Sequence, residues 1–196
     1  MRSQAPARVC LFGEHQDYLN HPVIAAAVDL HLTIQAEPRK DELFHIQKPD
    51  IREEESFSSR GELLPYTKPR DYFRSGINVL IKEGARIDHG LDVVVHSRIP
   101  VAAGASSSSV LNVAWIRLLR RHYLPELPED PVADAERAFQ AEVVEFNEPG
   151  GRMDHYASSL GGEDNGSGGG RSEERLGGKQ CRLRWSAYKE KKKNQG

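Results

Sequence analysis

The sequence is poor in cysteine and contains no long apolar run. Its 196 residues include two cysteines, Cys10 and Cys181, which are too few and too far apart for a disulfide framework or a zinc site. Such cysteine usage is typical of a reducing cytosol. No stretch approaches the roughly 20 apolar residues that span a bilayer, and residues 1–6 lack the apolar core of a signal peptide. We therefore expect a cytoplasmic protein with no membrane partner.

The chain also lacks an excess of basic residues over most of its length. The formal net charge is −2, but the residues from Gly161 onward carry nine Lys/Arg against five Asp/Glu, while the residues before it carry 18 against 24. The body is thus acidic and has none of the basic surface that nucleic-acid binding requires, so we expect no nucleic-acid partner. With 38% hydrophobic residues, a chain of this length fits one domain, or one domain and a small piece.

A loop of small residues is the most informative feature. Residues 99–112 read Ile-Pro-Val-Ala-Ala-Gly-Ala-Ser-Ser-Ser-Ser-Val-Leu-Asn, between a strand-like run, Leu91–His96, and an apolar, helix-periodic run that begins at Val110. Small residues let backbone N–H groups approach a ligand closely, and the helix N-terminus adds unpaired donors and partial positive charge. This pattern is typical of a phosphate site, although the Gly-Lys-Ser/Thr ending of a Walker A loop is absent. A small-residue turn whose serines only cap the helix is the alternative.

A polar cluster follows the first apolar run of the chain. Val9–Phe12 is interpreted as a buried strand, and Gly13–Asn20 follows it at once. In this segment Glu14 and Asp17 are carboxylates, which accept hydrogen bonds and therefore suit sugar hydroxyls, and Arg8 precedes the strand. The alternative is a solvated surface loop, which composition alone favours.

The remaining pattern predicts a chain of alternating strands and helices that ends in a polar segment. Strands are expected over residues 23–28, 30–36 and 43–46, a polar surface excursion over 50–66, and helices over 71–83, 110 to about 123, 132–146 and 153–160. From residue 162 the chain is rich in Gly, Ser and charge, so it cannot bury enough apolar surface to offset its ordering entropy, and we expect disorder. The lysines of residues 189–193 fit an interaction tail or, more simply, a solvated end.

Three stretches stand in an order that resembles a kinase family. They are Pro6–Arg8 with Gly13–Tyr18, then Pro100–Ser109, then Gly150–His155. The order resembles that of the small-molecule kinases named for galactokinase, homoserine kinase, mevalonate kinase and phosphomevalonate kinase, the GHMP kinases. Within this family, Gly-Glu-His-x-Asp-Tyr is similar to the galactokinase signature, and Gly-x-Met-Asp is similar to the galactokinase segment that carries the catalytic aspartate. The resemblance covers about residues 6–161.

The resemblance implies a fold and a division into domains. The expected fold is α+β, with a mixed sheet and helices packed on one side. Residues 1–161 would form the N-terminal, sugar- and ATP-binding domain of the family, and residues 162–196 a disordered tail without a family counterpart. The family's C-terminal domain, which closes the ligand cleft and contributes a further glycine-rich motif, has no counterpart in this chain, so a truncated form is expected.

The resemblance also implies roles for individual residues. Asp154 would face the anomeric hydroxyl of the sugar as the catalytic base, and Arg8 would lie beside it and stabilise developing negative charge. The sugar-binding residues would be Glu14, His15, Asp17 and Tyr18. The nucleotide phosphates would be bound by Pro100, Gly104, Ala105, Ser106, Ser107 and Ser108. The magnesium ion would be held by Ser108 and by Glu142, which stands twelve residues before Asp154.

The activity implied is transfer of phosphate from ATP, with Mg²⁺, to the anomeric hydroxyl of galactose or a related sugar, by a truncated and weakly active or inactive form. Ala102 and Ala105 stand where the family loop usually has glycine and leucine, and Gln16 stands where galactokinases often have threonine. Two alternatives stay open. One is a catalytically dead remnant that binds sugar or nucleotide, and the other is a mevalonate-type kinase, against which the Gly-Glu-His-x-Asp-Tyr segment argues.

Overall fold

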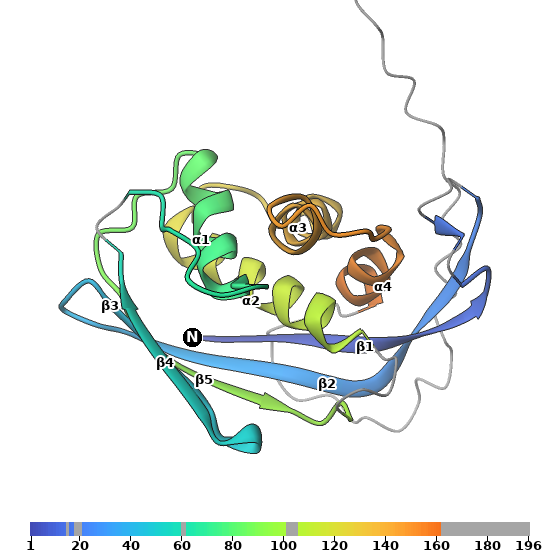
Figure 1. The fold of residues 1–196 in the computed structure, drawn as a ribbon, viewed down its shortest axis with the longest axis horizontal. Helices are drawn as coiled ribbons and strands as arrows, with labels where there is room; N and C mark the ends of the chain where they lie inside the picture. The colour runs from blue at the N-terminus through green and yellow to red at the C-terminus, as the bar shows by residue number, and fades with distance from the viewer. Residues whose placement is uncertain (15, 18–20, 60–61, 101–105, 162–196) are drawn as a thin grey trace, which may run out of the picture.

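The computed structural model of the chain describes residues 1–14, 16–17, 21–59, 62–100 and 106–161 (Figure 1). Its strands are β1 (Arg2–Phe12), β2 (Ile24–Pro38), β3 (Leu43–Lys48), β4 (Glu53–Ser58) and β5 (Leu91–Ser97). Its helices are α1 (Tyr72–Lys82), α2 (Ser107–Tyr123), α3 (Pro131–Phe139) and α4 (Met153–Gly161), with a 3₁₀ turn η2 (Pro49–Ile51) and a π turn η3 (Gln140–Val144). The disorder expected of residues 162–196 lies outside the described residues.

The five strands form one mixed sheet in the order β1-β2-β5-β3-β4. Neighbouring strands are antiparallel except β3 and β5, which run parallel with residues 45–47 opposite residues 92–94. Parallel neighbours need a long crossover connection, and here that crossover contains β4 and α1. The α+β class and the mixed sheet expected from the resemblance are therefore confirmed.

The helices α1 to α4 lie on one face of this sheet (Figure 1). α2 packs against β1 and β2, and the other three helices pack against α2. Trp115 of α2 is 1% exposed, and its ring meets those of Phe44 and Phe73 edge-to-face. Gly76 of α1 permits this packing, because an added Cβ would lie 2.6 Å from the indole of Trp115. The core is thus built around α2, and the N-terminus of α2 takes its position from that packing.

Two strand predictions differ from the structure. The run 9–12 is the end of β1 rather than a buried strand: Leu11 and Phe12 are 59% and 68% exposed. The buried part of β1 carries Ala5 and Ala7, and such small side chains give no apolar signal in the sequence. Segments 23–28 and 30–36 are one strand, β2, because Asp29 only takes an exposed position within it.

Two further predictions were wrong in the middle of the chain. The surface excursion over 50–66 contains β4, which pairs with β3 and buries Phe57 in a stack on Phe44 with 5.4 Å between ring centroids. One buried aromatic in a polar strand leaves no alternation to detect. The helix over 132–146 is α-helical only to Phe139 and continues as the π turn η3.

The other predicted elements are confirmed within a few residues. α1 ends before Gly84, whose φ of +96° is readily adopted only by glycine, and β5, α2 and α4 lie where the pattern places them. In the part of the chain that the structure describes, no helix has both the length and the apolar character needed to cross a membrane.

Candidate active site

One cavity of about 400 Å³ lies where five segments of the chain meet. These segments are the middle of β1, the loop that follows β1, the first turn of α2, the π turn η3, and the start of α4 with the loop before it. The lining residues are Arg8, Glu14, Asp17, Ser106, Ser108, Ser109, Glu142, Val143, Glu148, Pro149, Gly150, Gly151, Met153, Asp154 and His155. Seven residues that the sequence singled out therefore line one cavity, namely Arg8, Glu14, Asp17, Ser106, Ser108, Glu142 and Asp154.

Of the other six predicted site residues, the two that the structure describes, Pro100 and Ser107, are not among those that line the cavity. Pro100 and Ser107 are exposed; Ser107 neighbours Ser106 and Ser108 in sequence, but successive helical residues point in different directions. His15, Tyr18, Gly104 and Ala105 lie outside the described residues.

Asp154 is held by two partners from distant parts of the chain. The Nε of Arg8 donates to Oδ1 of Asp154 over 2.6 Å, and the hydroxyl of Ser106 donates to Oδ2. The Arg8 side chain is 9% exposed and that of Asp154 is 26% exposed. Burial acts to lower the pKa of Arg8, but the hydrogen bond and charge of Asp154, with the charge of Glu14, outweigh it and raise the pKa. The pair is therefore an ion pair at neutral pH, open to solvent on the side of the carboxylate.

Ser106 has an unusual backbone for the residue before a helix. Its φ of 54° and ψ of 43° lie in the left-handed region, where a non-glycine residue is uncommon. Its side chain makes no capping hydrogen bond to α2 and is directed to Asp154 instead. Ser106 therefore does not cap the first N–H groups of α2, which are groups of the kind that bind anions at helix N-termini. Strained residues of this kind cluster at ligand sites.

Asp17 contacts the start of α4. Its Oδ2 accepts a hydrogen bond from the backbone N–H of Met153 over 3.2 Å. Gly151 lies against the Asp17 carboxylate so closely that a Cβ at position 151 would overlap it. Glu14 is exposed at the rim of the same cavity. The loop after β1 and the helix that carries Asp154 are therefore in direct contact.

Glu142 is fixed by a histidine that the sequence analysis missed. The Nε2 of His155 lies 2.7 Å from Oε2 of Glu142, and both residues are buried. The ring of Phe139 meets that of His155 edge-to-face, with centroids 5.6 Å apart. The π turn η3 brings Glu142 to the cavity, since its extra residue shifts the side chains that follow. The available signal was the position of His155 directly after Asp154.

The cavity has an acidic lining. Its carboxylates are Glu14, Asp17, Glu142, Glu148 and Asp154, and its arginine is Arg8. This balance favours hydroxyl donors and cations and repels free phosphate. Oxygen ligands such as those of Glu142 and Ser108 suit Mg²⁺. Within the described residues, no group of three or more His, Cys, Asp or Glu side chains is arranged to hold a metal ion.

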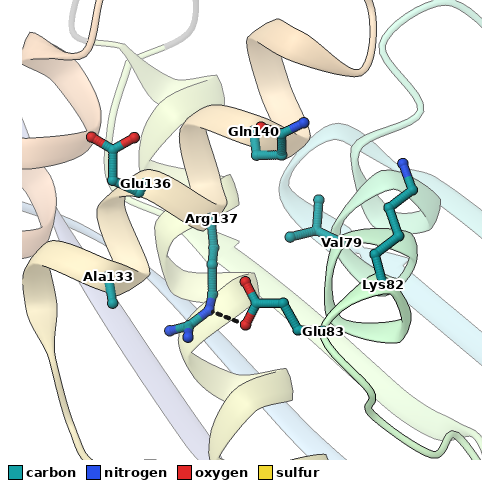
Figure 2. A pocket seen from close by; sticks show the side chains of 7 residues that line it. All are labelled: Val79, Lys82, Glu83, Ala133, Glu136, Arg137 and Gln140. Carbon is teal, nitrogen blue, oxygen red and sulfur yellow. Dashed lines mark hydrogen bonds and ion pairs between the residues drawn. The ribbon is translucent and has the colours of Figure 1, made fainter. Parts of the chain in front are cut away.

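A second hollow, of about 410 Å³, lies between α1 and α3 (Figure 2). Figure 2 shows Arg137 directed toward Glu83, to which it donates over 2.8 Å. Lys82 and Glu136 also have partners, Glu145 and Arg152, outside the hollow. Its charges are thus already paired, and none of the predicted site residues that the structure describes lines it.

The chain matches two family models and several known proteins. Residues 71–162 match the GHMP kinases N terminal domain, and residues 1–38 match the galactokinase galactose-binding signature. A galactokinase from Pyrococcus furiosus is 33% identical over 162 residues, covering 83% of this chain and 44% of the relative. A mevalonate kinase from the same organism is 31% identical over 145 residues, covering 67% and 42%. The crystal structure of Lactococcus lactis galactokinase complexed with galactose has a TM-score of 0.67 at 23% identity, covering 80% of this chain and 41% of that one.

These matches and the fold define the class of the protein. The chain carries a GHMP kinase N-terminal domain. Its first strands carry, in addition, the galactose-binding signature of the galactokinases. The chain spans less than half the length of the curated relatives that it matches.

Proposed function

We propose that this chain is the sugar- and nucleotide-binding part of an ATP-dependent sugar kinase of galactokinase type. The observation that carries the proposal is the meeting of Asp154, Arg8, Asp17 and the first turn of α2 around one cavity. Phosphoryl transfer depends mainly on positioning and on charge stabilisation, and these groups supply a proton acceptor, a cation, a hydroxyl-binding carboxylate and helix N–H donors. The galactokinase signature over residues 1–38 and the galactokinase relatives support galactose or a related sugar as substrate.

The contacts of Asp154 indicate how the sugar would bind. The anomeric hydroxyl would replace the hydroxyl of Ser106 as the donor to Oδ2, while Arg8 stays on Oδ1. Asp154 then accepts the proton of that hydroxyl, or orients it. Arg8 keeps the carboxylate charged and meets negative charge that develops nearby. Asp17 and Glu14 accept hydrogen bonds from other sugar hydroxyls.

The nucleotide phosphates would lie at the N-terminus of α2. Ser106 and Ser108 face the cavity there, and the helix end favours negative charge. Glu142 and Ser108 would hold Mg²⁺, which supplies the positive charge that an acidic cavity needs before a triphosphate can enter. Residues 1–161 are proposed as the unit that carries this site, and the remaining predicted contacts of His15, Tyr18, Gly104 and Ala105 belong to the same proposal.

The second part of the proposal is that the 196 residues by themselves are catalytically weak or inactive. They span 44% of the galactokinase relative, and the family resemblance implies that a further domain closes the cleft in a complete enzyme. Misplacement of reacting groups by about 1 Å lowers a rate by on the order of a hundredfold. A remnant that binds sugar or nucleotide without turnover is therefore the alternative. A mevalonate-type kinase is a second alternative. The mevalonate kinase relative supports this alternative, and the galactose-binding signature opposes it.

The test combines binding and turnover. In calorimetric titrations with galactose and with mevalonate, the chain should bind galactose. Asp17→Ala should weaken the binding of galactose at least fivefold. Release of ADP with ATP, Mg²⁺ and galactose should be near background in both the chain and its Asp154→Asn variant. Robust turnover that Asp154→Asn abolishes would refute the inactive form, and binding of mevalonate but not galactose would refute the substrate class.

A further inference from the structure

Asp17 occupies a position from which it caps the helix that carries Asp154. Its Oδ2 accepts from the N–H of Met153, the first residue of α4, and the two residues are 136 positions apart in sequence. The first N–H groups of a helix have no partner within the helix. A carboxylate at this place also meets the positive end of the helix dipole. The carboxylate of Asp17 therefore accepts a hydrogen bond from a backbone N–H group at the start of α4, although Asp17 lies outside the helix.

The loop before α4 is shaped around the Asp17 carboxylate. A Cβ on Gly151 would overlap Cγ and both carboxylate oxygens of Asp17, so Gly151 gives the carboxylate its space. The adjacent Gly150 has different surroundings, because a Cβ there would lie 3.1 Å from a methyl group of Val143. Gly151 thus contacts the Asp17 carboxylate, whereas the neighbouring Gly150 lies against Val143.

Asp17 is also positioned from its own side. The N–H of Gln16 donates to the carbonyl of Gly13 over 3.0 Å, which closes a tight turn directly before Asp17. Gly13 has a φ of +85°, in the region that favours glycine. The N–H of His21 then donates to the carbonyl of Gln16 over 3.1 Å. Both hydrogen bonds thus involve the backbone of Gln16, the residue directly before Asp17.

We propose that Asp17 is a positioning residue for Asp154, in addition to its proposed contact with the sugar. By capping α4 it holds the first turn of the helix, and with it Asp154, opposite Arg8 and Ser106. A sugar hydroxyl that binds Asp17 would then act on the same carboxylate that fixes the candidate base, and the two events become thermodynamically linked and reciprocal. The inference rests on the proposed function for the role of Asp154 and of the sugar.

The first experiment measures the cap without any ligand. In the 196-residue chain, the hydrogen exchange of the Met153 amide should be about fivefold faster in Asp17→Ala, the effect of losing a typical N-cap. Asp17→Asn should restore slow exchange, because asparagine caps a helix about as well as aspartate. The Arg8 Nε–H resonance, which reports the hydrogen bond to Asp154, should shift in Asp17→Ala and return in Asp17→Asn. Unchanged exchange and an unchanged Arg8 resonance in Asp17→Ala would overturn the inference.

The second experiment uses the two glycines as a matched pair. Gly151→Ala should reproduce the faster Met153 exchange and the Arg8 shift of Asp17→Ala while Asp17 itself is intact. Gly150→Ala, one residue away, should leave both signals as they are in the wild type. Equal effects of the two substitutions would overturn the inference, since a general loss of loop conformation would then account for them.

The third measurement separates this inference from the proposed function. Galactose should slow the exchange of the Met153 amide further in the wild type and not in Gly151→Ala. Asp17→Asn should keep the cap but bind galactose more weakly, because its amide is a poorer partner for hydroxyl donors than a carboxylate. If the wild type binds no galactose, the proposed function fails, while the exchange data on Asp17 and Gly151 still decide whether Asp17 positions α4.

Discussion

The ion pair between Arg8 and Asp154 is expected to stabilise the folded chain by about 2 kcal/mol. Hydrogen bonds to charged groups contribute about 1.5–3 kcal/mol, and breaking a fully buried pair costs about 3–5 kcal/mol. The 2.6 Å contact joins a side chain that is 9% exposed to one that is 26% exposed. Solvent at the carboxylate reduces the effect below that of a fully buried pair, which leads to the value of about 2 kcal/mol.

A double-mutant cycle measures this interaction directly. Arg8→Met keeps most of the apolar stem, and Asp154→Asn keeps the shape of the carboxylate. Urea unfolding should give a loss of about 2 kcal/mol for each single substitution and about the same loss for the double substitution, since either change removes a charge of the same ion pair. The matched control is Arg70 with Glu148, a two-bond pair at 2.7 Å whose side chains are 61% and 31% exposed. Its coupling should stay below about 1 kcal/mol.

Additive losses of stability would contradict this coupling. If the losses from Arg8→Met and Asp154→Asn sum in the double variant, the two side chains do not interact in the folded protein. A coupling no larger than that of Arg70 with Glu148 would equally contradict the role given to burial at this site.

Two further predictions concern histidines. Burial, with the charge of His89 beside it, lowers the pKa of His122, against the raising effect of Asp88. As the pH falls, the unfolded chain therefore binds the proton before the folded chain does, so stability should decrease below about pH 6.5 toward the lower folded-state pKa. The urea midpoint of His122→Gln should fall less than that of the wild type over that range. Equal pH profiles of the two proteins would contradict this prediction. At the cavity, His155→Ala should weaken Mn²⁺ binding in the presence of nucleotide by freeing Glu142, while His155→Gln, which can still donate to Glu142, should restore it; weakened binding that His155→Gln fails to restore would contradict the orienting role.

Several features of this protein could be predicted from local patterns in its sequence. The periodic apolar residues of 71–83 and the stop at Gly84 predict α1, because a helix needs only its own spacing of residues and a terminator. The loop before α2 stays a predicted anion site, because small residues and a helix N-terminus favour an anion. Asp154 and Arg8 were singled out as candidates through motif resemblance, since neither is distinguished by composition.

Features that depend on contacts between residues far apart in the sequence could not be predicted in this way. β4 is polar along most of its length and forms because β3 lies beside it and Phe57 stacks on Phe44. The π turn η3 interrupts a segment whose sequence predicts one continuous helix. In the structure, Glu142 of this turn contacts His155, which is a partner that the local sequence does not reveal. These outcomes are set by tertiary contacts, which override weak local preferences.

The candidate site shows the same division at the level of single side chains. The available carboxylates, serines and arginine could be named from the residue types alone. That Ser106 donates to Asp154 rather than capping α2, and that Asp17 accepts from the N–H of Met153, follows from how the chain is packed. The physical reason is that a hydrogen bond requires its donor and acceptor within about 3 Å, and residues 136 positions apart reach that distance only through the packing of α4 and the strands around α2.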